Sequence, residues 1–535
     1  MSMEKTQTKN KKILTVFTII KYVAAVILSF MAYGTVKSRR WILLCVIELC
    51  LIFFISQLIL KYNKIIGNIF NDIFMFVYCI QMGVLTFGNS YLTHIMLSNI
   101  NSFQALGEDS QMYIALIVLM IIVCLLPACY MDVKAKIYNF KIMIPGILVI
   151  YIVGVIVCGK QYSPVYSMFD LCMQEIEYKK MEKELDIENP DEFFNVVEDN
   201  RKKDTMLPER PNVIIIFTEG MSSYIIEDER NITPNIRKLM ENSLSFKNYY
   251  NHTFATYHGL QGQLYSGWSL NDLDTNSLIS VQDILCDSGY HTMFINTEPY
   301  NNDFSTYLAS FEYNELVHLE NEAYLGYADS MSDGQAYDFL FEKATELQKN
   351  NEPFLITMYS FGTHMNMDST NQKFQDGSNR VLNRFYNLDY EFGEFFDKFC
   401  NSSLKENTII IFTTDHATWV DNDVLESGLN YETSASLNRI PFFIYYDGIE
   451  PEVIDVDGRN SLAFAPTIID YLDMETDSYF MGDSLFNAHS DNIYDSYYFD
   501  GSAYLSTKHC VLHEIPEDEV EFFKKQLIKY FNVIK

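Results

Sequence analysis

The stretch NVIIIFTEG, residues 212–220, decides the fold of the larger part of this chain. Its apolar run does not alternate with polar residues, which is typical of a strand buried on both faces of a parallel sheet. Helix-like segments separate it from later strands, most clearly at 381–399, where apolar residues recur at helical spacing. The alternation of strands and helices predicts an α/β sandwich with a largely parallel sheet. The further strands are TMFINT (292–297), FLITMY (354–359), TIIIFT (408–413) and IPFFIYY (440–446).

The chain before this region is apolar. A bilayer-spanning helix needs about 20 residues, and no A-x-A cleavage site follows the first apolar run, so we interpret the runs as membrane spans and not as a signal peptide. We expect a transmembrane domain of five helices over 1–160, a juxtamembrane linker over 161–210 and a globular domain over 211–535. The five spans are predicted near 13–35, 41–60, 67–88, 112–130 and 142–159.

Charge is divided unequally between the two parts. The first 158 residues hold 13 Lys plus Arg and 6 Asp plus Glu, whereas the remainder holds 26 and 64, a net charge of −38. Such an acidic domain is a poor nucleic-acid binder, because phosphate contacts need Lys and Arg. It can still bind a phosphate ester if a metal ion supplies positive charge. The ten cysteines show no regular spacing, so neither a zinc ribbon nor a disulfide framework is predicted.

Basic residues in the loops predict the orientation in the membrane. An N-terminus inside the cell leaves only four basic residues on the outer side, and five spans then place the globular domain outside. The cluster KSRR (37–40) opposes this orientation. Lys21 interrupts the first span. We prefer the interpretation that it lies on a helix face turned toward other helices; the alternative is contact with a lipid headgroup or polymer. The lysines on the inner side are Lys5, Lys9, Lys11, Lys12, Lys61, Lys64, Lys134, Lys136 and Lys141.

The linker is rich in charge but carries apolar residues at a spacing that suggests one helix. We expect this helix to lie near the membrane surface, with an ordinary solvated helix as the alternative. The apolar positions are Phe169, Leu171, Cys172, Ile176 and Met181.

Acidic residues and histidines follow the predicted strands. Glu219, Glu298 and His364 come after the first three, and Asp415 with His416 follow the fourth. Ligands of parallel sheets bind beyond the carboxyl ends of the strands, and acids beside apolar runs are costly unless they serve a purpose. Carboxylates together with histidine suit Mn²⁺, Mg²⁺ or Zn²⁺. We therefore predict a metal site made of Glu219, Asp415 and His416, with Glu298 undecided between a structural and a functional role.

A nucleophile candidate lies in NHTFATYHGLQGQLYSG, residues 251–267. Thr256 precedes a short stretch that can open as a helix, and the free amides of a helix N-terminus favour a bound phosphate. A threonine activated by the metal can attack phosphorus and form a covalent intermediate. The alternative role of Thr256 is a helix cap, and Thr253 and Ser266 are rivals with less suitable positions.

These motifs resemble the alkaline-phosphatase-like sulfatase superfamily, and within it the branch of lipoteichoic acid synthases and phosphoglycerol transferases. The resemblance rests on TEG, TPN (233–235), ATYHGLQGQLYSG, GTH and TDH in that order and covers about 210–490. That branch also has five membrane helices before an extracellular catalytic domain. The resemblance implies that Thr256 is the nucleophile and that His364 contacts the substrate. It also implies a metal held by Glu219, Thr256, Asp415 and His416, with Mn²⁺ the first choice and Mg²⁺ or Zn²⁺ as alternatives.

By the same resemblance, the chain is expected to be a bacterial plasma-membrane enzyme of the Gram-positive type. It would move glycerol phosphate from an anionic phospholipid to a cell-envelope glycopolymer or glycolipid. Two departures leave the transferred group open. The Trp and Arg that the family places after the strand matching 292–297 are absent from NTEPYNNDFSTYL, and the usual Pro does not follow His364.

Three alternatives remain. The first is transfer of another group, such as phosphoethanolamine, and the second is hydrolysis of a phosphoester or sulfate ester. The third is a membrane sensor with a degenerate site. The C/S-x-P-x-R signature of sulfatases proper is absent, which disfavours a true sulfatase.

Overall fold

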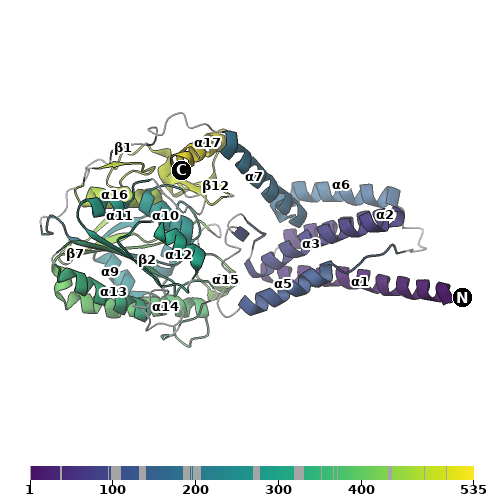
Figure 1. Cartoon of the computed structure of the whole chain (residues 1–535), viewed down its shortest axis with the longest axis horizontal. Coiled ribbons are helices and arrows are strands. Elements are labelled where there is room, and N and C mark those ends of the chain that lie inside the picture. The colour runs from purple at the N-terminus through teal and green to yellow at the C-terminus, as the bar shows by residue number, and fades with distance from the viewer. Residues whose placement is uncertain are drawn as a thin grey trace. The chain divides into compact units, whose positions relative to one another are not determined.

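Figure 1 shows the computed structural model of the chain. Two compact units are present, one of Met1–Ile100 and Glu108–Lys179 and one of Asn101–Gly107 and Lys180–Lys535. Parts of the expected linker (185–192, 194 and 197–205) and the loop lysines Lys37, Lys134 and Lys136 lie outside the described residues. The structure describes residues 2–36, 39–88, 90–93, 96–97, 110–131, 140–184, 193, 195–196, 206–268, 278–299, 301–318, 330–350, 352–365, 367–369, 371–431, 436–474, 476–501 and 503–534.

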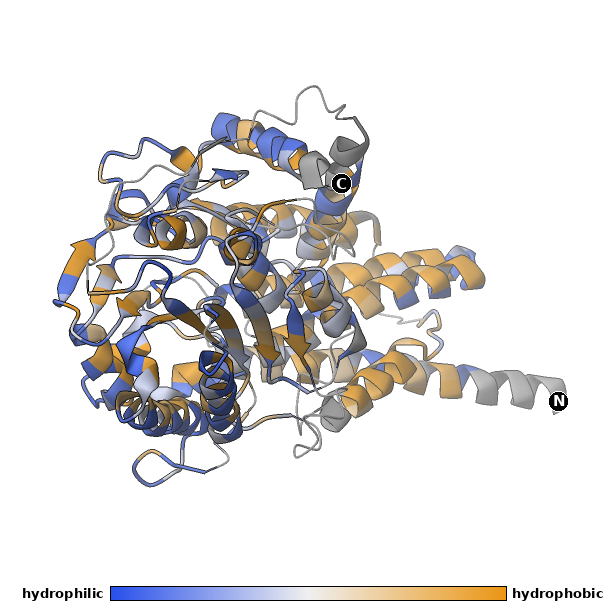
Figure 2. Cartoon of the chain, turned by 60° about the vertical axis from the view of Figure 1, so that its left-hand side comes forward, coloured by the Kyte–Doolittle hydropathy of each residue, from blue (hydrophilic) through white to orange (hydrophobic). Residues whose placement is uncertain are grey.

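The first unit contains the five expected apolar helices, coloured mostly as hydrophobic in Figure 2. Three of them include stretches long and apolar enough to cross a membrane, at Lys11–Gly34, Arg40–Tyr62 and Lys64–Thr86. In the described part of the chain the other two are shorter, with apolar stretches at Ile114–Cys124 and Ile142–Cys158. The helices are α1 (Ser2–Val36), α2 (Arg39–Tyr62), α3 (Lys64–Gly88), α5 (Ser110–Cys124) and α6 (Phe140–Cys158).

Lys21 of α1 is fully buried against α3. Its ammonium donates a hydrogen bond to Asn71 Oδ1 at 2.9 Å and forms an ion pair with Asp72 Oδ1 at 2.5 Å. A charge among apolar helices is stabilised by such partners. The preferred interpretation, a face turned toward other helices, is confirmed.

The helix expected in the linker is α7 (Pro164–Glu184). Leu171 is buried, whereas Phe169 and Ile176 are about 60% exposed. The carboxylate of Glu48 in α2 accepts hydrogen bonds from the Ser163 hydroxyl and from the backbone N–H of Val165. This contact fixes the start of α7 to the apolar helices of its own unit.

The second unit is built on an eight-stranded sheet with the order β5-β4-β6-β2-β7-β8-β3-β9. The segment at 212–218 is the central strand β2, and the five strands from β5 to β7 in this order are mutually parallel. The fold is therefore the expected α/β sandwich with a mostly parallel sheet. The strands are β2 (Asn212–Thr218), β3 (Leu244–Lys247), β4 (His291–Asn296), β5 (Glu315–Val317), β6 (Phe354–Ser360), β7 (Thr408–Thr414), β8 (Phe443–Tyr445) and β9 (Glu452–Asp455).

The run IPFFIYY differs from its prediction as a strand of the parallel sheet. Only Phe443–Tyr445 form a strand, and β8 runs antiparallel to both β7 and β3. An apolar run indicates burial on both faces but carries no information on strand direction.

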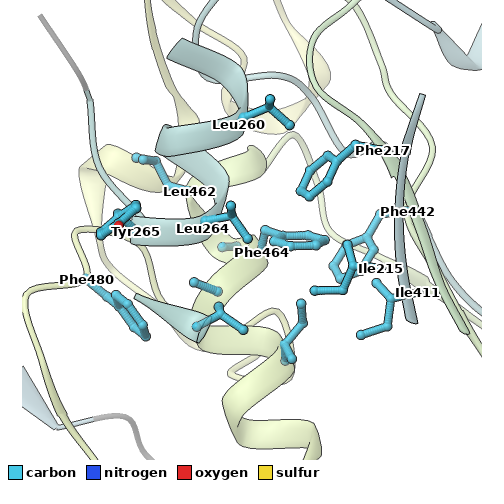
Figure 3. Close-up of a cluster of buried hydrophobic side chains, with 14 of the residues drawn as sticks. Ile215, Phe217, Leu260, Leu264, Tyr265, Ile411, Phe442, Leu462, Phe464 and Phe480 are labelled. Atoms are coloured by element: carbon cyan, nitrogen blue, oxygen red, sulfur yellow. The ribbon is translucent and has the colours of Figure 1, made fainter. Parts of the chain in front are cut away.

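Helices cover both faces of the sheet, because alternate side chains of β2 enter opposite cores. Ile215 and Phe217 pack toward α10, α11 and α16, with Phe464 and Leu264 among their neighbours in the same core (Figure 3). Ile214 and Ile216 pack toward the other face. The helices of the first face are α10 (Thr256–Tyr265), α11 (Val281–Asp287), α12 (Asn302–Ala309) and α16 (Phe464–Tyr471); those of the second are α8 (Ser223–Ile226), α9 (Pro234–Glu241), α13 (Asp333–Gln348), α14 (Arg380–Cys400) and α15 (Asn422–Ser427).

The C-terminal part adds small elements to the first face. β11 (Tyr497–Phe499), β12 (Tyr504–Ser506) and β13 (His513–Glu514) form an antiparallel sheet. The last helix, α17 (Glu517–Ile534), packs Phe523 edge-on against Trp268 at 5.0 Å between ring centroids. These contacts tie the end of the chain to the core beneath α10.

Candidate active site

The ends of two neighbouring strands bring the predicted metal ligands together. β2 and β7 are paired in register up to Thr218 and Thr414, so the residues that follow them are adjacent. One ligand atom each from Glu219, Asp415 and His416 lies within 4.8 Å of the others. His416 Nε2 is 3.4 Å from Glu219 Oε1 and 3.5 Å from Asp415 Oδ2.

Backbone groups hold the Asp415 and His416 side chains in place. Asp415 Oδ1 accepts hydrogen bonds from the N–H groups of Gly220, at 2.9 Å, and His416, at 2.7 Å. Its other oxygen, Oδ2, is buried without a partner. His416 Nδ1 lies 2.8 Å from the carbonyl of Ala417, which favours the proton on Nδ1 and leaves the Nε2 lone pair facing the carboxylates.

Thr256 is the first residue of α10 and lies against the same carboxylates. Its hydroxyl donates a hydrogen bond of 3.1 Å to Glu219 Oε2. The residue before it, Ala255, has φ of 72° and ψ of 152°, a conformation that costs an L-residue about 1–3 kcal/mol. Strain of this kind persists where surrounding contacts require it, and here it sets the direction of the Thr256 side chain.

The rest of α10 is packed closely against the end of β7. A Cβ on Gly259 would lie 2.1 Å from the carbonyl oxygen of Asp415, so only glycine permits this approach. Gln263 Nε2 donates to the carbonyls of Thr414 at 2.8 Å and Asp415 at 3.0 Å. The contacts of Gly259 and Gln263 thus hold α10, and with it Thr256, against the end of β7, which two of the candidate metal ligands follow.

Electrostatics within the cluster favour a cation. Burial acts to raise the pKa of Glu219, but the charge of His416 outweighs it and the pKa is lowered. Burial and the charge of Glu219 raise the pKa of Asp415 to about 8. Burial acts to lower the pKa of His416, yet the two carboxylates raise it to about 9. Without a metal the cluster therefore binds protons more tightly than the free side chains would, and a divalent cation would take the place of those protons.

The cluster fits a divalent metal. Glu219, Asp415 and His416 are exposed by 4%, 1% and 5%, and buried carboxylates are stable when they are paired or bind a metal. The unpartnered Asp415 Oδ2 and the free Nε2 of His416 provide donor atoms, and Thr256 Oγ1 lies beside Glu219 as a fourth. Mn²⁺, Mg²⁺ and Zn²⁺ all accept such oxygen and nitrogen donors.

His364 and Glu298 surround the cluster. His364 is half-buried, stacks on Phe361 and places Nδ1 3.0 Å from the carbonyl of Met365, so its Nε2 remains for a substrate. It is not part of the three-residue ligand group found among the described residues. Burial raises the pKa of Glu298 well above its usual value, and the charges of Glu219 and Asp415 add to this effect.

Two residues that form hydrogen bonds with Glu219 could not be identified from the sequence. The Tyr359 hydroxyl donates to Glu219 Oε2, and the Thr363 hydroxyl donates to the Glu219 carbonyl at 2.6 Å. Tyr359 is the penultimate residue of β6 and appears in the sequence as one more buried strand residue. The rival nucleophile Ser266 is buried, and its hydroxyl donates to the carbonyl of Leu462, which is a structural role.

Solved structures similar to this chain include the following three, two of which have TM-scores above 0.5. A protein of the alkaline phosphatase superfamily from Vibrio parahaemolyticus has a TM-score of 0.52 and 18% identity, covering 68% of this chain and 94% of its own. The integral membrane lipooligosaccharide phosphoethanolamine transferase A from Neisseria meningitidis has a TM-score of 0.55 and 11% identity, covering 85% and 95%. The lipoteichoic acid synthase LtaP from Listeria monocytogenes has a TM-score of 0.49 and 16% identity, covering 67% and 97%.

One family model matches a segment of the globular unit. A comparison with curated protein sequences gives no match. The family model described as sulfatase matches residues 211–474, the segment that contains β2 to β9 and every ligand of the candidate metal site. Residues 211–474 therefore match the sulfatase family model, and the solved structure from Vibrio parahaemolyticus shares their fold.

Proposed function

We propose that this protein is a membrane-bound phosphotransferase that moves a phospholipid headgroup to a cell-envelope glycopolymer or glycolipid through Thr256. The observation that carries the proposal is the hydrogen bond from Thr256 to Glu219, inside a buried cluster fit for a divalent cation. A strained residue precedes Thr256, and a hydroxyl at a helix N-terminus faces amides that favour phosphate. A threonine that only capped a helix would require neither the strained conformation of Ala255 nor a hydrogen bond to Glu219.

The proposed reaction has two displacement steps. Thr256 Oγ1 gives up its proton and attacks phosphorus, the bond from phosphorus to the diacylglycerol oxygen breaks, and that oxygen takes up a proton. An acceptor hydroxyl then gives up its proton and attacks the phosphothreonine, the bond from phosphorus to Thr256 Oγ1 breaks, and Oγ1 takes up a proton, so protons balance in each step. A divalent cation held by Glu219, Asp415 and His416 would lower the pKa of the threonine hydroxyl and stabilise charge on the phosphoryl oxygens. His364, whose Nδ1 lies near the carbonyl of Met365, would contact the phosphoryl group through Nε2.

The two units of the chain support a lipid donor. Apolar helices keep an enzyme at the bilayer, where a phospholipid headgroup is within reach. The domain itself is strongly acidic, so an anionic donor needs local positive charge at the site, which the cation and the start of α10 provide. We place this domain outside the plasma membrane of a Gram-positive bacterium, on the basis of the loop charges and the resemblance.

Glycerol phosphate is the group we propose to be transferred, because the motif order resembles the phosphoglycerol transferases. One observation favours phosphoethanolamine as a second candidate. Glu298 follows β4, near Glu219 and Asp415, and no lysine or arginine lies in the following segment 297–309. A buried carboxylate pairs better with an ammonium group than with a glycerol hydroxyl.

Trapping the covalent intermediate tests the function and the group together. The full chain, loaded with Mn²⁺, is incubated with phosphatidylglycerol or with phosphatidylethanolamine, and the mass of the peptide that contains Thr256 is measured. We expect an adduct on Thr256 whose mass identifies the group. Thr253→Ala should form the same adduct and serves as the matched control, whereas an adduct-free Thr256 with both lipids would contradict the proposal.

A further inference from the structure

Arg384 is a buried arginine whose guanidinium lacks hydrogen-bond partners. It lies in the second turn of α14, is 2% exposed, and neighbours Leu382 and Phe385, which belong to the apolar core on that side of the sheet. Its Nε and Nη1 atoms are buried and make no hydrogen bond. The guanidinium carbon lies 5.4 Å from the centroid of the Phe385 ring, a cation–π contact that accepts no hydrogen bond from these two N–H groups. Buried N–H groups of a cation that lack hydrogen bonds are strongly unfavourable. The arrangement therefore indicates that an anion completes the site.

The nearest acids of the surrounding elements are engaged elsewhere. Asp423 of α15 forms an ion pair with Arg380 at the start of α14. Asp421 caps α15, because its Oδ1 accepts the N–H of Val424 at 2.9 Å. These carboxylates attract the charge of Arg384 but accept no hydrogen bond from its Nε and Nη1 atoms.

The guanidinium interacts electrostatically with residues of the candidate active site. It attracts the carboxylate of Glu219, and burial together with this positive charge acts to lower the pKa of His364. Asn387, one turn after the arginine on the same face of α14, donates a hydrogen bond of 3.0 Å to Asp333 Oδ2. Asp333 in turn lies against Gly362, two residues before His364, so contacts join this face of α14 to the loop that carries His364.

We propose that Arg384 binds an anionic oxygen of the phosphate group that is held at Thr256, using its two unpartnered N–H groups. Guanidinium donors in a fork match two oxygens of a phosphate, which a lysine cannot do. The inference rests on the proposed function, since it assigns Arg384 to the phosphate of the same reaction. The same oxyanion chemistry is shared by a phospholipid headgroup and by inorganic phosphate.

Calorimetric titration of inorganic phosphate into the metal-loaded full chain in detergent tests the site without any need for turnover. We expect Arg384→Met to weaken phosphate binding at least tenfold, about 1.4 kcal/mol, and Arg384→Lys to weaken it less. Arg230→Met, which removes a surface arginine paired with Asp228, is the matched control and should bind phosphate like the wild type. Wild-type affinity in a metal-loaded Arg384→Met protein overturns the proposal. If that variant does not fold, wild-type affinity in Arg384→Lys overturns it, because one ammonium cannot replace two forked donors.

Turnover of the lipid donor then identifies the source of the oxyanion. A rise in KM or a fall in kcat of tenfold or more for Arg384→Met assigns the contact to the headgroup phosphate. Unchanged lipid turnover with weakened phosphate binding assigns it to free phosphate. A wild-type protein that turns over no lipid refutes the proposed transferase, while the titration still decides whether Arg384 binds an oxyanion.

Discussion

The hydroxyl of Thr256 donates a 3.1 Å hydrogen bond to Oε2 of Glu219, a buried carboxylate that also accepts from Tyr359. The nucleophile candidate and a metal ligand candidate are thus in direct contact. They come from different elements, the start of α10 and the end of β2. The contact joins the proposed nucleophile to a proposed metal ligand. Because these roles belong to different residues, mutation can test each role separately.

Thr256→Ala should abolish transfer while the metal stays bound. The loss of the nucleophile is expected to lower kcat by about 10³-fold or more. Glu219, Asp415 and His416 remain to hold the ion, so metal content by elemental analysis should be near that of the wild type. Thr256→Ser should keep part of the activity, because serine supplies a hydroxyl at the same place. Wild-type turnover by Thr256→Ala would locate the nucleophile elsewhere.

Metal affinity should rise with pH between about 6.5 and 9. A metal displaces the protons of Asp415, whose pKa is raised to about 8, and of His416, whose pKa is raised to about 9. Calorimetry in two buffers of different ionisation enthalpy should therefore detect proton release on Mn²⁺ binding at pH 7. The control is the Asp415→Ala, His416→Ala double mutant, and full metal occupancy in that protein would refute the site.

The same shifts predict how the metal-free protein responds to pH. Both pKa values are raised on folding, so the folded protein holds protons that the unfolded chain has released, and stability falls as pH rises toward 9. Glu219 has a lowered pKa, but its contribution is complete well below pH 7 and does not change in this window. Thermal unfolding of the metal-free chain should show a falling Tm from pH 6.5 to 9. Mn²⁺ should reduce that slope.

Much of the fold was predictable because its signals are local. The spacing of phenylalanines predicted a helix at 381–399, and α14 spans Arg380–Cys400. The apolar runs predicted the central parallel strands, and polar residues at their ends predicted the cluster of Glu219, Asp415 and His416. Each of these signals is contained in a single segment and needs no knowledge of its neighbours.

The missed features depend on contacts between distant segments. The antiparallel direction of β8 and the hydrogen bond from Tyr359 to Glu219 join residues far apart in the chain, and neither leaves a local pattern. Arg384 did leave a signal. It lies on the same helical face as Val381 and Leu388, and a charge inside an apolar stripe is costly unless it has a function.

A reporter fused after the C-terminus should report an extracellular position. With the N-terminus inside, five apolar helices place the domain outside, and a reporter such as alkaline phosphatase should be active. A fusion at Asn63, between α2 and α3, is the control and should be inactive, since the basic residues Lys61 and Lys64 lead us to expect this loop in the cytoplasm. The reverse pattern would mean that the KSRR cluster sets the orientation.

Ala255→Gly should separate stability from activity. Glycine adopts the positive φ of residue 255 without strain, so the protein should gain about 0.5–1 kcal/mol. The freer backbone should hold Thr256 less firmly and lower kcat several-fold. Ala309→Gly, at the exposed last residue of α12 where the helix-interior penalty of glycine does not apply, is the control and should change the stability little. A destabilised Ala255→Gly protein would show that the strain is not real.

Gly259→Ala should impair the site although residue 259 touches no substrate. The new methyl group would lie 2.1 Å from the carbonyl oxygen of Asp415, so α10 must move away from the end of β7. Overpacking of this kind costs about 1–3 kcal/mol, and a displacement of about 1 Å at a nucleophile lowers the rate about 10²-fold. Metal content should change little, because the ligand triad comes from β2 and β7. Gly83→Ala, where the nearest atom is 3.8 Å from the new carbon, is the control and should leave kcat unchanged. Unaltered kcat in Gly259→Ala would mean that the close approach of α10 to Asp415 does not position Thr256.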